Sequence, residues 1–240
     1  MADAIEFQAV AWGALVNQGV SQAQFVQLQA IAKVDHDSDS CVVGVEWICA
    51  RLAQLVALPA PAPAFTRSSD GRLWFVCLQF GDLKQLPAPV VPPQLVADHP
   101  DLAAGIVAFD AWVANADRHP QNLAYVPGKV PPVIFDHGHA FAAGGSRAKL
   151  TQLPSHLVDP APTGCLVPHL STAKPFGLWL SVLTGVPSAS IQRIAEEAVS
   201  AGALRADESH LIHDYLVKRQ SHLSAALRAG CSALTDWGIV

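Results

Sequence analysis

The chain has 240 residues, of which 51% are hydrophobic and 15% are charged, and its formal net charge is −5 at pH 7. A chain of this length and composition can bury a substantial core, which predicts a globular protein of one large domain or two small lobes. The acidic balance excludes the strongly basic surface typical of nucleic-acid-binding proteins, so we expect no nucleic-acid partner.

The sequence predicts neither a membrane span nor a signal peptide. Polar residues interrupt every apolar stretch before it reaches the roughly 18 residues that indicate a spanning helix. The start, Met1-Ala2-Asp3-Ala4-Ile5-Glu6, is acidic, whereas a signal peptide begins with basic residues. The 5 cysteines are odd in number and widely spaced, which favours reduced thiols. We therefore expect a cytoplasmic protein.

Short apolar runs separated by turn residues occupy the first third of the chain, and they predict strands at 7–12, 25–28 and 30–34. After a polar stretch, apolar residues recur from Val45 at the spacing i, i+3, i+4, i+7 and i+11. This spacing is typical of a helix, which we expect to end before Pro59. Residues 73–78 return to the pattern of a buried strand.

Two proline clusters, at 59–63 and 87–93, predict extended connectors, and we expect the second to link two lobes. The pattern beyond it is helical, over 101–114, from Ser188 as the N-cap to Gly202, and from Asp207 to Gly230. Strands thus precede helices, which indicates an α+β protein. We expect an N-lobe over residues 1–90 and a helical C-lobe over residues 91–240.

The chemistry-bearing residues of the chain concentrate between Asn115 and Gly138. Pro120 has no N–H and disfavours the helical conformation in the residue before it, so this segment must leave the preceding helix as a loop. Asp117 and Asn122 are therefore expected on a loop. The apolar runs that follow, at 123–126 and 133–136, flank six residues rich in proline and glycine, which predicts a hairpin with a long loop.

The expected register of this hairpin pairs Val126 with Val133, which would place Leu123 opposite Asp136. Asn122 and Asp136 would then emerge together at the open end of the ribbon. Directly opposed residues in a sheet lie roughly 5 Å apart at Cβ. An amide oxygen and a carboxylate at that separation can share one Mg²⁺ ion, which prefers oxygen ligands.

Asp117 precedes Asn122 by five residues, which places its carboxylate to accept a hydroxyl proton or to orient a nucleophile. An aspartate, four residues and then an asparagine, followed later by Asp-x-Gly, is the spacing of a kinase catalytic loop. In this chain the later motif is Asp136-His137-Gly138. The pattern predicts Asp117, Asn122 and Asp136 as catalytic residues of a site for ATP and Mg²⁺.

The same segment resembles the HipA-like kinases, which are distantly related to the phosphatidylinositol kinases. That family typically shows Asn-x-Asp-Arg-His-x-x-Asn and a later Ile-Asp-His-Gly. This chain reads Asn115-Ala-Asp-Arg-His-Pro-Gln-Asn122 and then Ile134-Phe-Asp-His-Gly138. The resemblance covers roughly residues 5–145. It implies a two-lobed, protein-kinase-like fold with a small β-rich N-lobe and a mostly helical C-lobe.

By this resemblance, Lys33 would contact the α and β phosphates of ATP and Glu46 would hold Lys33. Asp117 would be the catalytic base, and Asn122 and Asp136 would bind Mg²⁺. Lys33 lies within an apolar strand, where an unpaired ammonium would be costly to bury, which favours a charged partner. The structural alternative is a solvated lysine on an edge strand and an exposed helix glutamate.

The chain has no Gly-x-Gly-x-x-Gly pattern of the kind that forms a phosphate-binding loop. The candidate segment is 17–22, in which Gly19 is the only glycine that could expose backbone N–H groups to a phosphate. Some members of the family autophosphorylate a serine in this loop, which makes Ser21 a candidate regulatory site. An ordinary hairpin turn is the alternative interpretation of Gly19 and Ser21.

The family resemblance implies an ATP-dependent phosphotransferase that phosphorylates a serine or threonine hydroxyl of an unknown protein substrate, autophosphorylation included. It also suggests an antitoxin-like partner, as in toxin–antitoxin systems. A first alternative is a nucleotide-binding pseudokinase or interaction module without turnover, which the glycine-poor loop favours. A second is a metal-dependent hydrolase in which His119, His137 and His139, with Asp117 and Asp136, bind a transition metal. We expect Arg118 and His119 to brace the loop through hydrogen bonds.

Overall fold

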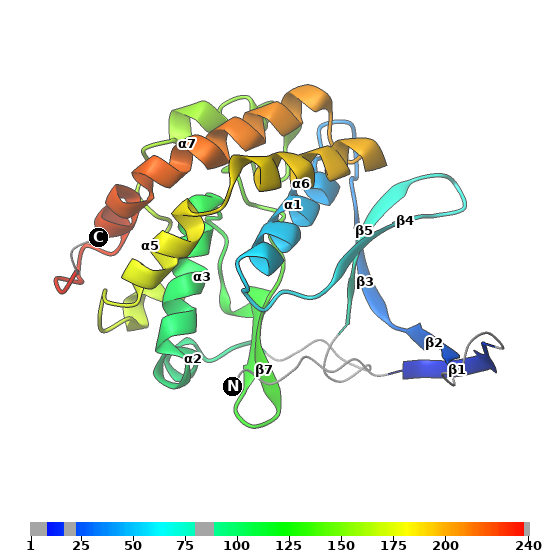
Figure 1. The fold of residues 1–240 in the computed structure, drawn as a ribbon, viewed down its shortest axis with the longest axis horizontal. Coiled ribbons are helices and arrows are strands. Elements are labelled where there is room, and N and C mark those ends of the chain that lie inside the picture. Colours follow the sequence, from blue (N-terminus) through cyan, green and yellow to red (C-terminus); the bar gives the residue numbers. More distant parts are fainter. Residues whose placement is uncertain (1–8, 17–22, 80–88, 238–240) are drawn as a thin grey trace.

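The structure is a computed structural model that describes residues 9–16, 23–79 and 89–237. Figure 1 shows helix α1 (Val42–Leu55) in the middle of the molecule, with a three-stranded sheet on one side of it and helices from the later part of the chain on the other side and across one end. The fold is α+β, as the sequence predicted, with the strands mainly in the first part of the chain.

The sheet beside α1 is antiparallel and has the order β3 (Ala30–Val34), β5 (Leu73–Leu78), β4 (Pro63–Arg67). Its central strand β5 is the continuous apolar run identified in the sequence, because a central strand has neighbours on both edges and a helix on one face. Phe75 of β5 lies opposite Lys33 of β3 and Phe65 of β4, and it is buried.

A second antiparallel pair, β1 (Ala9–Leu15) with β2 (Gln24–Leu28), projects away from the helices (Figure 1). Its large apolar side chains face solvent: Trp12 is 69% exposed and Phe25 is 65% exposed. The predicted strands at the start of the chain are therefore present, but their apolar side chains contribute little to the core.

Helix α1 begins where the polar stretch after β3 supplies a cap. Asp35 Oδ1 accepts a hydrogen bond of 3.0 Å from the backbone N–H of Val43, which satisfies one of the free donors of the first turn. The helix ends before Pro59, as predicted. Trp47 stacks on Phe65 of β4 with ring centroids 4.1 Å apart, while Gly44 leaves room for Leu204, which lies between the last two helices of the chain.

The remaining helices form the larger part of the molecule. They are α2 (Pro92–Asp98), α3 (Pro100–Trp112), α4 (Arg147–Leu150), α5 (Phe176–Thr184), α6 (Ser188–Ala201) and α7 (Ala206–Gly230), with short 3-10 turns at Pro120–Asn122, Leu153–His156 and Val167–His169. Helix α3 is buried from Ala103 to Trp112 without interruption, so it is the central helix of this part.

The expectations at Pro92 and Ser188 differ from the structure. Pro92 lies in the first turn of α2 rather than in a linker, because proline has no N–H to leave unpaired there and its φ suits a helix. Pro93 also lies in α2, Pro89 precedes the helix in a segment without regular structure, and Pro87 lies outside the described residues. Ser188 is the first residue of α6, not its N-cap, and its hydroxyl lies 2.9 Å from His213 Nε2 on α7.

One hydrophobic cluster joins α1 to the central helices, and it includes the fully buried side chains of Leu52, Phe109, Trp112 and Phe176. The sheet and the helical part are therefore packed onto one core rather than onto two. In the part of the chain that the structure describes, no helix combines the length and the hydropathy that crossing a bilayer requires.

Candidate active site

The predicted hairpin after the loop is present as β6 (Leu123–Val126) and β7 (Val130–Ile134). Its register differs from our prediction: Val126 pairs with Val130, not with Val133. The turn consists of three residues and includes Gly128 at a φ of 68°, a left-handed conformation that glycine adopts without strain.

Pro131 and Pro132 lie within β7 instead of the loop, next to an irregularity in the register. Proline is accepted in this position because a two-stranded ribbon leaves one edge of each strand unpaired, and because a bulge removes one residue from the ladder. The sequence argument assigned both prolines to the loop, and that shifted the expected pairing.

Asn122 and Asp136 nevertheless lie close to each other at the open end of the hairpin. Leu123 pairs with Ile134, and the backbone N–H of Phe135 donates to the carbonyl oxygen of Asn122 at 3.2 Å. Asp136 follows immediately, with a φ of 58°. Aspartate is among the few residues that tolerate this left-handed conformation, and here it turns the chain away from the strand.

The loop aspartate and the asparagine are joined by a hydrogen bond. Asn122 Nδ2 donates to the backbone carbonyl of Asp117 at 2.8 Å, and the Asn122 side chain is buried. Among the described residues no donor reaches the amide oxygen of Asn122. The Asp117 carboxylate is 42% exposed, with His119 Nε2 3.7 Å away. The bond fixes the backbone of Asp117 and leaves its carboxylate accessible.

Arg118 holds the loop and the hairpin together. Its guanidinium makes two hydrogen bonds of 2.9 Å to the carboxylate of Asp110 on α3, and Nη1 donates at 2.9 Å to the carbonyls of Asn122 and Phe135. Burial lowers the pKa of Arg118, but the Asp110 carboxylate raises this pKa by more than burial lowers it. The pKa of Arg118 therefore lies above its usual value. The bracing role expected for Arg118 is confirmed.

Lys33 on β3 lies between two carboxylates from distant segments. Its Nζ is 2.5 Å from Glu46 Oε1 on α1 and 2.5 Å from Asp136 Oδ1 after β7. Burial lowers the pKa of Lys33, but these carboxylates more than offset it, so the pKa is raised. Burial raises the pKa of Asp136, but Lys33 reverses the effect and the pKa is lowered. Both groups are therefore charged.

Glu46 connects α1 to the segment that follows Asp136. Its carboxylate is almost fully buried and accepts a second hydrogen bond, of 3.0 Å, from the backbone N–H of His137. A Cβ on Gly138 would come within 3.3 Å of Glu46 Oε1, so a small residue suits this position. Burial raises the pKa of Glu46 despite the nearby Lys33 ammonium.

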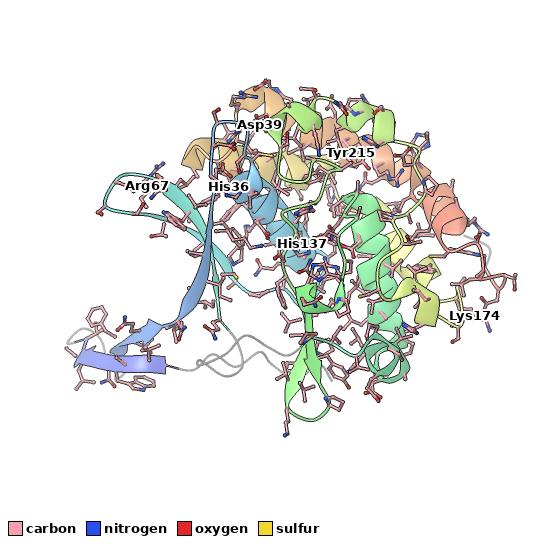
Figure 2. The ribbon with its side chains drawn as sticks, turned by 180° about the vertical axis from the view of Figure 1, so that it is seen from behind. His36, Asp39, Arg67, His137, Lys174 and Tyr215 are labelled. Carbon is pink, nitrogen blue, oxygen red and sulfur yellow. The ribbon has the colours of Figure 1, made fainter. Side chains whose placement is uncertain are left out.

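The histidines of the segment do not form a metal cluster. The His137 imidazole is buried against Phe109, with ring centroids 5.8 Å apart, and burial lowers its pKa well below the usual value. Figure 2 shows His137 in the interior between α1 and α3. Across residues 9–16, 23–79 and 89–237, no three His, Cys, Asp or Glu side chains are placed to hold a metal ion. The transition-metal hydrolase hypothesis therefore gains no support.

Two expected nucleotide-binding residues, Gly19 and Ser21, lie outside the described residues. The structure brings the other five together through the contacts given above. Sequence reasoning missed Asp110, the partner of Arg118. The sequence could have indicated this role, because Asp110 is the single charged residue in the apolar stretch from Leu102 to Trp112. A charge buried in such a stretch needs a partner.

Comparison with known proteins identifies a fold. No family model and no curated protein matches the sequence. The crystal structure of the proinflammatory kinase CtkA from Helicobacter pylori is similar with a TM-score of 0.61 at 12% identity, over 85% of this chain and 90% of that chain. The chain therefore has the fold of a HipA-like kinase, as the sequence resemblance predicted.

A second solved structure is similar with a lower TM-score. It is HipA of the toxin–antitoxin system of Shewanella oneidensis MR-1, in complex with HipB and operator DNA. The TM-score is 0.43 at 13% identity, and the similarity covers 99% of this chain and 69% of that chain.

Proposed function

We propose that this chain is an ATP-dependent phosphotransferase of the HipA-like kinase type, which transfers phosphate to a serine or threonine hydroxyl of a protein. The observation that carries the proposal is the position of Lys33, whose Nζ lies 2.5 Å from both Glu46 and Asp136. A lysine and a glutamate paired in this way, beside a metal-binding aspartate, are the parts that a kinase needs to orient the phosphates of ATP.

The donor set suits Mg²⁺. The amide oxygen of Asn122 and the ionised carboxylate of Asp136 are hard oxygen ligands, and two protein ligands suffice for an ion that keeps waters and binds phosphate oxygens. When bound, the metal would supply charge neutralisation at the phosphates. Asn122 and Asp136 would hold it from the open end of one hairpin, where the backbone N–H of Phe135, the residue before Asp136, donates to the carbonyl oxygen of Asn122.

The other side chains have complementary tasks. Lys33, kept in its charged form by its two carboxylates, would bind phosphate oxygens, and Glu46 would keep the ammonium in place. Asp117, with an accessible carboxylate and a backbone fixed by Asn122, would accept the proton of the incoming hydroxyl. Phosphoryl transfer requires mainly such positioning and charge stabilisation from the protein.

We further propose that ATP binds between an N-lobe of residues 1–90 and a C-lobe of residues 91–240, and that Gly19 and Ser21 belong to the phosphate loop. The substrate protein and an antitoxin-like partner are inferred from the sequence resemblance alone. The 5 free cysteines support a reducing compartment such as the cytoplasm.

Incubation of the purified chain with ATP and Mg²⁺, with and without a general protein substrate, tests the proposal by mass spectrometry of incorporated phosphate. We expect incorporation by the wild type. We expect a loss of at least about 100-fold in Asp117→Asn and Asp136→Asn, because each removes a charge that acts in the transition state. Arg72→Ala, on an exposed side chain of the β4–β5 turn, is the matched control and should retain activity.

Two outcomes would assign the chain to another class. Thermal stabilisation by ATP without any phosphate incorporation, in wild type and variants alike, would indicate a pseudokinase. Hydrolysis of a substrate in the absence of ATP, lost on metal chelation, would indicate a hydrolase.

A further inference from the structure

The segment after Asp136 returns to the beginning of α1 and pairs with it. The backbone N–H of Cys41 donates to the carbonyl of Gly145 at 2.8 Å, and the backbone N–H of Arg147 donates to the carbonyl of Asp39 at 2.6 Å. The Asp39 carboxylate accepts a further bond of 2.6 Å from the Ser146 hydroxyl. Residues 145–147 therefore hold the entry to the helix that carries Glu46.

Arg147 extends this pairing to two further elements through its side chain. Nη1 lies 2.5 Å from Glu208 Oε2 in the first turn of α7, and Nη2 lies 3.2 Å from Asp35 Oδ2 in the loop after β3. Nη2 also donates to the carbonyl of Ala203 at 3.3 Å. The guanidinium is only 15% exposed, so it joins the first and last parts of the chain in a largely dry environment.

Asp35 connects Arg147 to the segments that carry Lys33 and Glu46. It follows Lys33 by two residues on the same chain segment. Its Oδ1 accepts the backbone N–H of Val43 at 3.0 Å, while its Oδ2 faces Arg147. Glu46 lies one helical turn beyond Val43. A shift of Asp35 would therefore displace both Lys33 and Glu46.

The charges of this cluster require Arg147. Asp35 and Glu208 both face its guanidinium, and Glu208 is 2% exposed. Arg205 also pairs with Glu208, at 2.7 Å, but Asp35 has no second arginine among the described residues. Removing Arg147 would leave the Asp35 carboxylate without a cation, close to the buried carboxylate of Glu208. Removing one partner of such a charged cluster is strongly unfavourable.

We propose that Arg147 is a positioning residue that clamps the end of β3 and the start of α1 to the segment after Asp136, and so keeps Lys33, Glu46 and Asp136 assembled. Figure 2 shows Asp39, at the entry to α1, beside the end of the molecule formed by α6 and α7. The effect on phosphate transfer rests on the proposed function. The clamp itself can be tested without catalysis.

Cys41 reports directly on the clamp. It is the residue before α1, it is 0% exposed, and burial raises the pKa of its thiol to about 12, so it should resist alkylation while the clamp is closed. Cys231, near the end of the chain, is 2% exposed, and burial raises the pKa of its thiol to about 11. Arg147 contacts the first turn of α7, whereas Cys231 follows the last residue of that helix. Alkylation of Cys231 therefore reports general unfolding rather than opening of the clamp.

Alkylation by iodoacetamide under native conditions, read peptide by peptide, compares the wild type with Arg147→Ala, Arg147→Lys and the control Arg72→Ala. We expect Arg147→Ala to accelerate Cys41 alkylation by about tenfold or more, because it loses two charged hydrogen bonds, while Cys231 is unchanged. The rate of Cys41 alkylation in Arg147→Lys should lie between those of the wild type and Arg147→Ala, and the rate in Arg72→Ala should match the wild type. An unchanged Cys41 rate, or equal acceleration at Cys41 and Cys231, would overturn the proposal.

Asp35→Asn tests the same contact from its other side, with a milder change. The amide oxygen can still accept from Val43, but the charge facing Arg147 is lost. We expect a smaller acceleration at Cys41, and a double variant with Arg147→Ala no faster than Arg147→Ala alone, since both remove one interaction. Fully additive effects would show that Asp35 and Arg147 act separately, against the proposal.

Kinetics with ATP then connects the clamp to the site. In Arg147→Ala we expect the KM for ATP to rise by about tenfold and kcat to fall, with partial rescue in Arg147→Lys, because Lys33 and Glu46 would separate. Wild-type kinetics in a variant with an exposed Cys41 would contradict the positioning role. If the wild type itself transfers no phosphate, the proposed function fails, and the alkylation result still decides the clamp.

Discussion

Lys33 is the residue at which three segments of the chain meet. Its ammonium is partly buried, and a buried charge is stable only when ion pairs and hydrogen bonds replace its lost hydration. Glu46 and Asp136 do so from positions 13 and 103 residues away. The same contacts that keep the lysine charged place it beside the aspartate proposed to bind metal.

Glu46 offers a matched pair of substitutions at this scale. Glu46→Ala removes the acceptor of both Lys33 and the backbone N–H of His137, and leaves that buried N–H without a partner. We expect a loss of roughly 2 kcal/mol in the free energy of unfolding. Glu46→Gln keeps an acceptor and should lose less. Urea denaturation of both variants measures the difference, and equal losses would contradict the assigned hydrogen bonds.

Tyr215 on α7 has a buried hydroxyl that makes no hydrogen bond within the described part of the chain. Tyr215→Phe removes this group and keeps the ring, so we expect unchanged or higher stability at neutral pH, by up to about 1 kcal/mol. Thermal unfolding at pH 7 measures the change. A clear loss of stability would show that the hydroxyl has a partner, such as a bound water.

Alkaline pH gives an independent check on Tyr215. Burial raises its pKa from the usual 10.0 to about 12. The folded state thus keeps the phenol proton where the unfolded state releases it, and the resulting stabilisation is present below pH 10 and lost as the pH rises toward 12. Stability should fall less between pH 9 and pH 11 in Tyr215→Phe than in the wild type, as followed by urea denaturation.

At the scale of elements, helix α3 depends on a glycine for its contact with α5. A Cβ on Gly105 would lie 2.2 Å from the ring of Trp179, whose Nε1 also donates to the carbonyl of Asp101 on α3 at 2.7 Å. The ring therefore sits directly on the backbone of α3 and is held in place from that side.

Gly105→Ala should destabilise the protein by roughly 1–3 kcal/mol, because overpacking exceeds the modest gain in helix propensity that alanine brings. Ser181→Ala, on the exposed face of the same helix as Trp179, is the control and should be close to neutral. Chemical denaturation compares the two. A stabilised Gly105→Ala variant would mean that α3 and α5 are further apart than the structure shows.

The hairpin β6–β7 keeps Asn122 and Asp136 at the same end although its register differs from the expected one. Pairing depends on the turn, and a three-residue turn with Gly128 moves the partner of Val126 from Val133 to Val130. The open end is less affected, because Arg118 binds the carbonyls of Asn122 and Phe135 together. The bulge in the ladder absorbs the difference between the two strands.

At the scale of the whole molecule, the N-terminal sheet and the helical part share α1. Leu52 on this helix is 0% exposed and belongs to the cluster that includes the central helices. Leu52→Ala should lower the free energy of unfolding by about 2–5 kcal/mol in a single transition, because the cavity would affect both parts at once.

Leu55, on the same helix but 42% exposed, supplies the control, and Leu55→Ala should cost far less. Tryptophan fluorescence and far-UV circular dichroism should report coincident transitions for both variants. Separate transitions in Leu52→Ala would show that the sheet unfolds independently of the helices.

Local patterns predicted most of the elements. The spacing of apolar residues indicated α1, α3, α6 and α7 close to their observed bounds, and the apolar runs indicated β3 and β5. The same reasoning assigned Asp117 to a loop and Asn122 and Asp136 to one end of a hairpin. These predictions succeed because they depend on periodicity and on the stereochemistry of proline, which act between near neighbours.

The sequence by itself therefore determined the order of the elements and the residue types at the candidate site. Only the tertiary structure decided which partners those residues have: Lys33 with Asp136, Arg118 with Asp110, and Arg147 with both Asp35 and Glu208. The physical reason is that a charged side chain specifies the kind of partner it needs, but packing of distant segments around a common core selects which residue fills that place.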